Sequence, residues 1–235
     1  MTQNKSIWEE IKLCFRLIPY SVNWKMQLFV SGLFILVALL QLLPVFFDGP
    51  VNALGGLYFV LAPLMMCQML MVLTYSGMVQ SSVYKHRIQC RLFALQSLVM
   101  LLASYVVMAV IALTLHAAGV MDSLQLAGFV VPFLGGLLYF TWYYPVIYKL
   151  GKSYFLVLFV AMLLGITFAV QGFVFTGVMD RIATFVAGIP FGLMLLVPVP
   201  VVFLMAWLMY VVANKMYRKP LSEWYVLQAF KQASR

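Results

Sequence analysis

The chain has 235 residues, of which 65% are hydrophobic and only 9% carry a charge. A soluble domain carries about 25% charged residues, so the polar side chains here are too few to cover a surface that faces water. This composition excludes a soluble enzyme, a disordered chain and a secreted disulfide scaffold. It predicts an integral membrane protein, whose net charge of +9 lies at the membrane edges rather than against nucleic acid.

The first 25 residues, 1–25, predict a cytoplasmic amphipathic helix in the membrane interface. Ser6 and Glu9 form a capping-box pattern, in which both side chains satisfy free amides at a helix start. Apolar residues then recur at helical spacing, with Trp8 beside them: Ile7, Ile11, Cys14, Phe15 and Ile18. The charged residues expected on the remaining surface are Glu9, Glu10, Lys12 and Arg16. Pro19 ends or kinks the helix, which is interpreted either as a membrane anchor or as a mechanical part.

Six charge-free stretches follow, and each exceeds the roughly 20 apolar residues that a helix needs to cross about 30 Å of hydrocarbon. The predicted spans lie near 27–47, 57–79, 93–115, 126–147, 154–177 and 194–214. A membrane barrel would alternate polar and apolar positions, and these runs do not. The predicted fold is therefore an all-α integral membrane protein with a six-helix transmembrane domain over 26–214 and a basic cytoplasmic tail over 215–235.

The distribution of lysine and arginine predicts the orientation. With six spans, all of the 15 Lys and Arg residues except Arg181 fall on the side that holds both termini. The opposite loops hold Asp48, Asp122 and Asp180 instead. Because cytoplasmic loops are enriched in basic residues, we expect both termini to lie in the cytoplasm. No cleavable signal peptide is evident, since the first apolar run starts only after Lys25.

The segment 80–91 is the most polar stretch between predicted spans. It is basic, offers Ser81 or Ser82 as a helix cap, and has Val83 and Ile88 as apolar points. It is interpreted either as a short surface helix that docks a cytoplasmic partner or as an ordinary basic loop.

The last apolar run is longer than one crossing requires and contains Pro190, Pro198 and Pro200. Proline removes a helical hydrogen bond, so 182–193 is predicted to be an external interfacial or re-entrant piece before the final span. One long, kinked helix is the alternative.

Two glycine pairs, Gly55-Gly56 and Gly135-Gly136, are interpreted as points of close helix packing rather than as signs of duplication.

The sequence predicts no catalytic site and no metal site. Gly151-Lys152-Ser153 lacks the upstream glycine of a phosphate-binding loop, because position 146 is valine. The methionine-rich run 65–71 is assigned to flexible packing rather than copper binding, and His116 to a structural role. No span has a clearly central charge, which argues against proton-coupled transport. Gln41 and Gln171 are among the polar residues that either bond between helices or line a polar route.

The predicted architecture resembles the permease subunit of type 2 ABC exporters. The shared features are six spans with both ends inside, an amphipathic helix before the first span, and a basic cytoplasmic segment between spans two and three. The string Tyr144-Pro145-Val146-Ile147-Tyr148-Lys149-Leu150-Gly151-Lys152 is similar to one in small bacterial permeases of this class, including exporters of toxic or antimicrobial peptides. The segment 80–95 lacks the acidic residue and the leucine-proline step that are frequent in these relatives.

The resemblance implies a second permease copy or a sister permease, and separate ABC ATPase subunits that bind ATP and magnesium. This chain would hold no cofactor of its own and would be no enzyme, in a bacterial cytoplasmic membrane. The residues implied to couple to the ATPase are Tyr84, Lys85, His86, Arg87 and Arg91. Those implied for the gate helix are Trp8, Ile11, Phe15 and Ile18, and for the translocation path Gln41 and Gln171. The implied cargo is an amphipathic or hydrophobic peptide, with lipids or drugs as other cargo.

Two other functions remain open on the sequence. One is a substrate-binding membrane subunit of a vitamin or metal importer, which would carry a ligand pocket inside one protomer. The other is a non-transport helper that organises or protects membrane partners, which would show no ATPase-dependent flux.

Overall fold

The computed structural model describes residues 7–21, 24–47, 54–74, 77–150, 160–161, 164–165, 168, 172 and 176–217. Within these residues every regular element is helical, as the sequence predicts. The α-helices are α1 (Ile7–Leu17), α2 (Trp24–Leu40), α3 (Leu54–Thr74), α4 (Gly77–Gln80), α5 (Phe93–Ala117), α6 (Ser123–Leu150), α8 (Val178–Ala187), α9 (Phe191–Leu196) and α10 (Pro198–Tyr217). Two short 3₁₀ helices, η1 (Ile18–Tyr20) and η2 (Leu43–Phe47), follow α1 and α2, and a π-helix, η3 (Arg87–Leu92), leads into α5.

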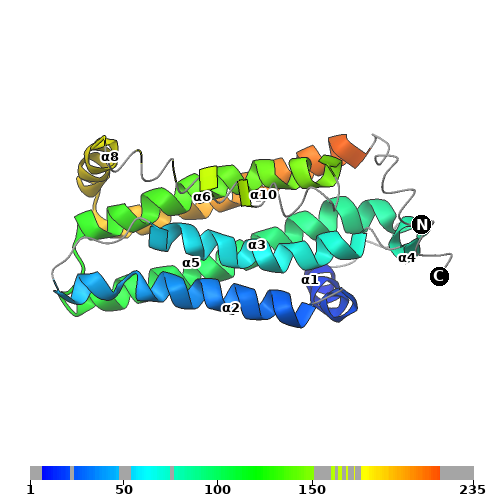
Figure 1. Ribbon diagram of the computed structural model, residues 1–235, viewed down its shortest axis with the longest axis horizontal. Helices are drawn as coiled ribbons and strands as arrows, with labels where there is room; N and C mark the ends of the chain where they lie inside the picture. Colours follow the sequence, from blue (N-terminus) through cyan, green and yellow to red (C-terminus); the bar gives the residue numbers. More distant parts are fainter. Residues whose placement is uncertain are drawn as a thin grey trace.

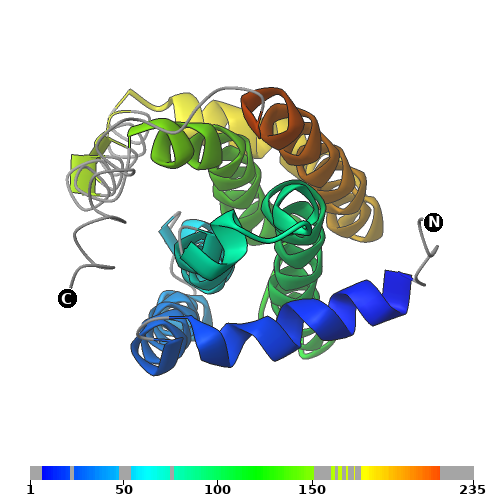
Figure 2. The same ribbon diagram turned by 90° about the vertical axis from the view of Figure 1, so that its right-hand side faces the viewer.

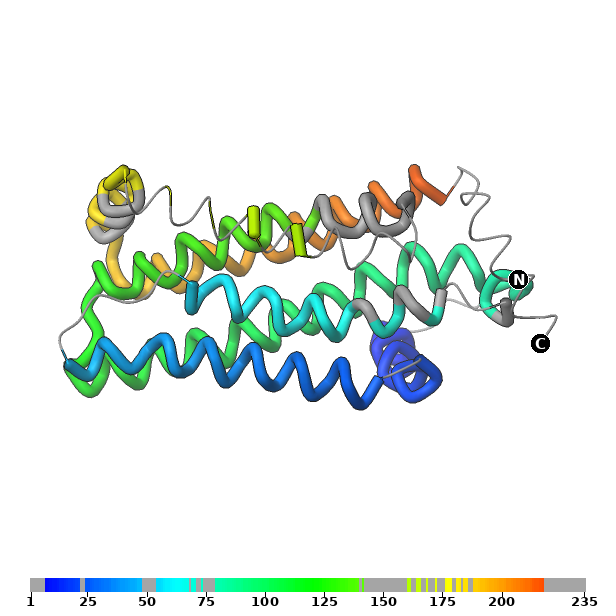
Figure 3. The backbone as a smooth tube through the Cα atoms, viewed as in Figure 1, coloured from blue at the N-terminus to red at the C-terminus, as the bar shows by residue number. Residues whose placement is uncertain are grey.

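The long helices α2, α3, α5, α6 and α10 lie side by side along the long axis of the molecule (Figure 1). Helix α1 crosses one end of this bundle, as the view along the bundle in Figure 2 shows, and α8 crosses the other end (Figure 1). The tube in Figure 3 shows α2, α3, α5 and α6 running alternately away from α1 and back toward it. The C-terminal end of α10 returns to the α1 end, so charged residues from several segments meet there.

The described helices have the composition of a membrane protein. Three stretches are long and apolar enough to cross a membrane: Trp24–Phe47, Arg87–Ala117 and Phe191–Tyr217. The described apolar parts of α3 and α6, Leu54–Cys67 and Ser123–Tyr139, are shorter. The all-helical class is thus confirmed, and the three long apolar stretches support a membrane protein, while six spans and the side of the termini stay predictions. Most of the predicted span 154–177 lies outside the described residues.

Several boundaries differ from the predicted ones. The predicted span 93–115 begins earlier, because Lys85, His86 and η3 continue without a break into α5. The last helix extends to Tyr217, three residues into the predicted tail. The alternative of one continuous helix through 182–214 is wrong, since α8 ends at Ala187 and α9 starts only after Pro190. Proline at that point lacks the amide that would continue the helix.

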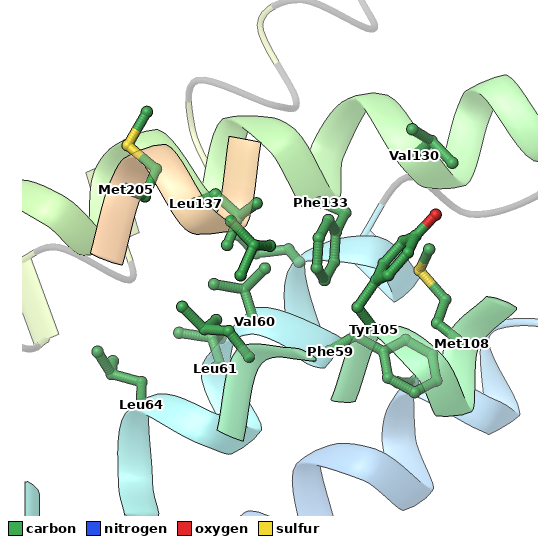
Figure 4. Packing of buried hydrophobic residues seen from close by; sticks show 14 of the residues in the cluster. Phe59, Val60, Leu61, Leu64, Tyr105, Met108, Val130, Phe133, Leu137 and Met205 are labelled. Carbon is green, nitrogen blue, oxygen red and sulfur yellow. The ribbon is translucent and has the colours of Figure 1, made fainter. Parts of the chain in front are cut away.

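Close approach of α3 and α6 positions the core of the bundle. A Cβ on Gly56 would lie 2.0 Å from the backbone oxygen of Phe129, and one on Gly55 would lie 2.4 Å from the Phe129 ring. The residues that fill the core around this contact come from α3, α5, α6 and α10 (Figure 4), and include Phe59, Tyr105, Phe133, Leu137 and Met205. Gly55-Gly56 therefore serves the close packing that the sequence predicts.

Two side-chain hydroxyls of α5 donate to backbone carbonyls of neighbouring helices, and one of them compensates for a proline inside the bundle. Pro63 lies within α3 and has no amide to donate to the carbonyl of Phe59, four residues earlier. The hydroxyl of Ser104 on α5 donates a hydrogen bond to that carbonyl. The hydroxyl of Tyr105 donates a second hydrogen bond from α5, to the carbonyl of Leu195 just before the break between α9 and α10. Interhelical hydrogen bonds of this kind tie α5 to both interrupted helices.

We expect Ser104→Ala to lower the free energy of unfolding by about 1 kcal/mol, because the Phe59 carbonyl would lose its donor. The measurement is unfolding of the detergent-solubilised protein by titration with a denaturing detergent. In a Pro63→Ala background the restored backbone amide can take over the carbonyl, so Ser104→Ala should cost less there. An equal cost in both backgrounds would contradict this account of Ser104.

Candidate functional site

Helix α1 presents three kinds of surface around its circumference. Glu10 and Cys14 are buried against the bundle, and Leu13 and Leu17, on the same side, pack against the core. Trp8 and Phe15 are exposed and Ile11 is half-buried, while Ile18 lies beyond the helix in η1. Lys12 lies over the Trp8 ring, with its Nζ 5.5 Å from the ring centre. Of the predicted gate residues, Trp8 and Phe15 thus lie on the outer side of α1, and different residues attach α1 to the bundle.

Glu10 is the centre of this attachment. Its side chain is only 2% exposed, and its Oε1 lies 2.5 Å from Nη2 of Arg87 while its Oε2 lies 2.8 Å from Nε of Arg91. Both arginines are in η3, one helical turn apart, so one carboxylate joins α1 to the start of α5. A carboxylate buried with two guanidinium partners is far better accommodated than one buried alone. We call Glu10, Arg87 and Arg91 the Glu10 junction.

The burial of Glu10 corrects the sequence interpretation, which placed it on the exposed surface. A carboxylate near the start of a helix usually lies in solvent, where it interacts favourably with the helix dipole. The sequence therefore predicted an exposed Glu10. The spacing of Glu10 from the apolar residues of α1 does indicate that it is buried. Glu10 shares a helix face with Leu13, Cys14 and Leu17, at spacings of three, four and seven residues. Arg87 and Arg91 are four residues apart, so both can lie on one side of their helix and face the same carboxylate.

Cys14 lies one turn after Glu10 on the same face. Its Sγ lies 3.5 Å from the backbone oxygen of Leu92 and donates to it. Burial, together with the nearby negative charge of Glu10, raises the pKa of the Cys14 thiol to about 12. Because the raised pKa keeps the thiol protonated and neutral at physiological pH, Cys14 acts as a buried donor rather than a nucleophile.

Lys85 and His86 contact the end of α10. The Nε2 of His86 lies 2.8 Å from Oδ1 of Asn214, and its ring centre lies 4.6 Å from that of Tyr217. The Nζ of Lys85 lies 5.9 Å from the centre of the Tyr217 ring. Together with the Glu10 junction, these contacts connect the start of α5 to α1 and α10 at one end of the bundle.

The turn between α4 and the start of α5 is the most exposed part of the predicted coupling segment. Val83 is 96% exposed and Tyr84 is 63% exposed. The backbone amide of Tyr84 donates a hydrogen bond to Oγ of Ser82, over 3.1 Å. The segment 80–91 is therefore not one separate surface helix. It consists of a turn with an apolar tip, which we call the Val83–Tyr84 tip, followed by the first turns of the α5 helix.

Gln41, one of the two predicted path residues, does not lie at this junction. Gln41 follows α2 at the opposite end of the bundle, where its Cβ would contact a Cβ added at Gly55, 3.2 Å away. Gln171 lies outside the described residues. Within the part of the chain that the structure describes, no three His, Cys, Asp or Glu side chains come together as a metal site. His116 in the last turn of α5 stacks on Phe191 at the start of α9, with ring centres 3.8 Å apart, and its Nδ1 hydrogen-bonds with the backbone oxygen of Met121.

The fold and the junction define the class of protein as an all-helical membrane protein with a charged contact between a crossing helix and the bundle. No family model, curated protein or solved structure matches the chain. Its function is therefore argued from the geometry of the junction.

Proposed function

We propose that this chain is the transmembrane permease subunit of an ATP-driven ABC exporter of the type 2 class. The observation that carries the proposal is the Glu10 junction, because it joins the two segments that such a permease must couple. The candidate gate helix is α1, and the candidate ATPase-docking segment is the turn before α5. The ion pairs join α1 to η3, which directly follows this turn, over 2.5 to 2.8 Å.

The junction gives a physical route for a mechanical signal. A partner that binds the Val83–Tyr84 tip would move the residues that follow it, and these run directly into η3 with Arg87 and Arg91. Because both arginines hold the same buried carboxylate, a displacement of η3 draws α1 with it. The five predicted coupling residues thereby separate into two roles: Tyr84 contacts the ATPase, and Arg87 and Arg91 transmit its movement. Lys85 and His86 carry the same movement to α10.

The arrangement of helices also supports a permease with six spans. Helix α6 begins beside α8 at one end of the bundle and runs toward the α1 end (Figure 3). A crossing by the predicted span 154–177 would connect the end of α6 to the start of α8. Six helices with few interior polar groups leave little room for a conduit in one chain, so we propose a path between two copies or sister permeases. Both termini would face the cytoplasm, and the cargo would be an amphipathic or hydrophobic peptide.

The proposal is tested by purifying the tagged chain from its native cells and identifying co-eluting proteins by mass spectrometry. We expect an ABC ATPase in stoichiometric amount, whose ATP hydrolysis in reconstituted vesicles drives peptide export. Val83→Asp combined with Tyr84→Asp should weaken ATPase binding by roughly 30-fold or more, because aromatic and apolar anchors dominate such interfaces. The matched control is Phe185→Asp, since Phe185 is 81% exposed on α8 at the opposite end.

Three outcomes separate the alternatives. ATPase binding that survives the tip variant would contradict the docking role of the turn. A stoichiometric ATPase with inward flux and tight substrate binding to one protomer would replace the exporter with an importer subunit. A chain recovered without an ATP-binding partner under several mild conditions would overturn the transport proposal and favour the membrane-helper function.

A further inference from the structure

A groove opens beside the Glu10 junction, between α1, α5 and α10. It has a volume of about 420 Å³. Its polar end is formed by Glu10 and Arg91, and its walls by apolar and aromatic side chains. These wall residues are Ile7 on α1, Ala94, Leu95 and Leu98 on α5, and Phe203, Ala206, Trp207 and Tyr210 on α10.

The groove changes from charged to apolar along its length. On α5 the lining residues follow Arg91 at successive turns, at positions 94, 95 and 98, so they lead away from the junction by about 10 Å at 1.5 Å per residue. The lining residues of α10 run back along the same direction, from Tyr210 through Trp207 to Phe203. Tyr and Trp are typical of the depth where a membrane changes from headgroups to hydrocarbon. The groove is thus polar at the end of the bundle and apolar toward its middle.

The charged end carries an excess of positive charge. Arg87 and Arg91 together hold two positive charges against the one negative charge of Glu10, which leaves a formal charge of +1. Arg91 is 54% exposed and uses its Nε for Glu10, whereas the Arg87 side chain is only 25% exposed. Arg91 also lines the groove, so its exposed guanidinium group is available to donate hydrogen bonds to a phosphate there.

We propose that this groove binds one anionic phospholipid of the surrounding membrane, with its phosphate at Arg91 and an acyl chain along Leu95, Leu98 and Phe203. A phospholipid matches both halves of the groove, because its fixed anion and its acyl chain are joined in the observed order. A hydrophobic peptide supplies the apolar part without a fixed anion. The inference needs only a membrane around the bundle and stands whether or not the chain is an exporter permease.

The test is lipid retention by the full-length chain in nanodiscs, transferred to detergent and measured by native mass spectrometry. The probes are phosphatidylglycerol and phosphatidylcholine with the same dioleoyl chains. We expect one retained phosphatidylglycerol per chain. Arg91→Gln should lower its occupancy about fivefold, which is the usual effect of one basic residue on an anionic lipid. The control Arg16→Gln removes the same charge from an exposed position on α1 outside the groove and should leave occupancy unchanged.

Two further variants separate a lipid site from a purely structural role of the arginines. Glu10→Gln raises the local charge to +2 and should increase phosphatidylglycerol retention, whereas a structural role would make it fall as Arg91→Gln does. Leu95→Trp fills the groove without touching the ion pairs and should abolish retention of phosphatidylglycerol. Glycerophosphoglycerol, the headgroup without chains, should not displace the lipid.

The proposal is overturned if phosphatidylcholine is retained as well as phosphatidylglycerol, or if Arg91→Gln and Arg16→Gln give the same occupancy. Displacement by glycerophosphoglycerol would show a phosphate site without a lipid, and displacement by a neutral hydrophobic peptide would show a peptide groove. Each of these results is distinct from loss of the ATPase partner, which concerns the Val83–Tyr84 tip alone.

Discussion

Replacement of both Arg87 and Arg91 with methionine is expected to lower the free energy of unfolding by about 3–5 kcal/mol, because it leaves a buried carboxylate without a partner. Glu10 is 2% exposed and cannot recover its hydration without leaving the bundle. Detachment of α1 is the simplest way to hydrate it, so trypsin should cleave at Lys12 and Arg16 faster than in the parent chain. Thermal unfolding in detergent and the rate of this cleavage are the two measurements.

The matched control is the triple variant that also carries Glu10→Met. With the carboxylate gone, three apolar side chains of similar length can pack together, and most of the lost stability should return. The single variant Glu10→Met should cost less than the double arginine variant, since Arg91 is 54% exposed and can turn to water. A triple variant as unstable as the double one would show that the arginines stabilise through packing rather than by pairing with Glu10.

Substitution of Gly56 by alanine is expected to lower the free energy of unfolding by about 3 kcal/mol or more, at the upper end of overpacking effects. The added Cβ would lie 2.0 Å from the Phe129 backbone oxygen and 3.1 Å from the backbone nitrogen of Phe133. Both contacts are with helix backbone, which cannot rotate aside as a side chain can. Helices α3 and α6 would have to separate, and unfolding in detergent should show the loss directly.

Gly135→Ala is the control, because Gly135 lies on α6, one of the two packed helices, at a position with open space around it. No heavy atom lies within 4 Å of a Cβ built there. Alanine is a better helix former than glycine by about 1 kcal/mol, so this variant should be as stable as the parent or slightly more so. Equal losses at positions 56 and 135 would refute the assignment of close packing to Gly56.

The helical class follows from the sequence because hydrocarbon leaves a chain few ways to satisfy its backbone groups. Long apolar runs between charges therefore locate α2, α5 and α10 to within a few residues. Internal boundaries are harder, since Leu54 and Leu57 are equally apolar and only turn geometry decides where α3 starts. The π-helix η3 was not predicted either, as its residues alone would form an ordinary helical turn.

The sequence predicted the basic residues of the candidate site but not its acidic residue, Glu10. Positive charge outside a span has a general cause, the positive-inside rule, so the group from Lys85 to Arg91 is visible in the sequence. The burial of Glu10 has a specific cause, a contact between positions 77 residues apart. Such a pairing depends on how α1 crosses the bundle, and no local pattern specifies that crossing.

The three-sided surface of α1 has a consequence for how the protein responds to bilayer thickness. One side is fixed to the bundle through Glu10, Leu13 and Leu17, while Trp8 and Phe15 are exposed on the outer side, and side chains of this kind favour the membrane interface. The attachment of α1 therefore fixes the position of these two side chains, and of the membrane surface that they favour, relative to the bundle. Because α1 is attached to the bundle, it cannot adjust its depth freely in a thinner or thicker bilayer. The mismatch in thickness would therefore strain the two ion pairs of Glu10. Lipid composition then acts on the same contact that joins α1 to α5.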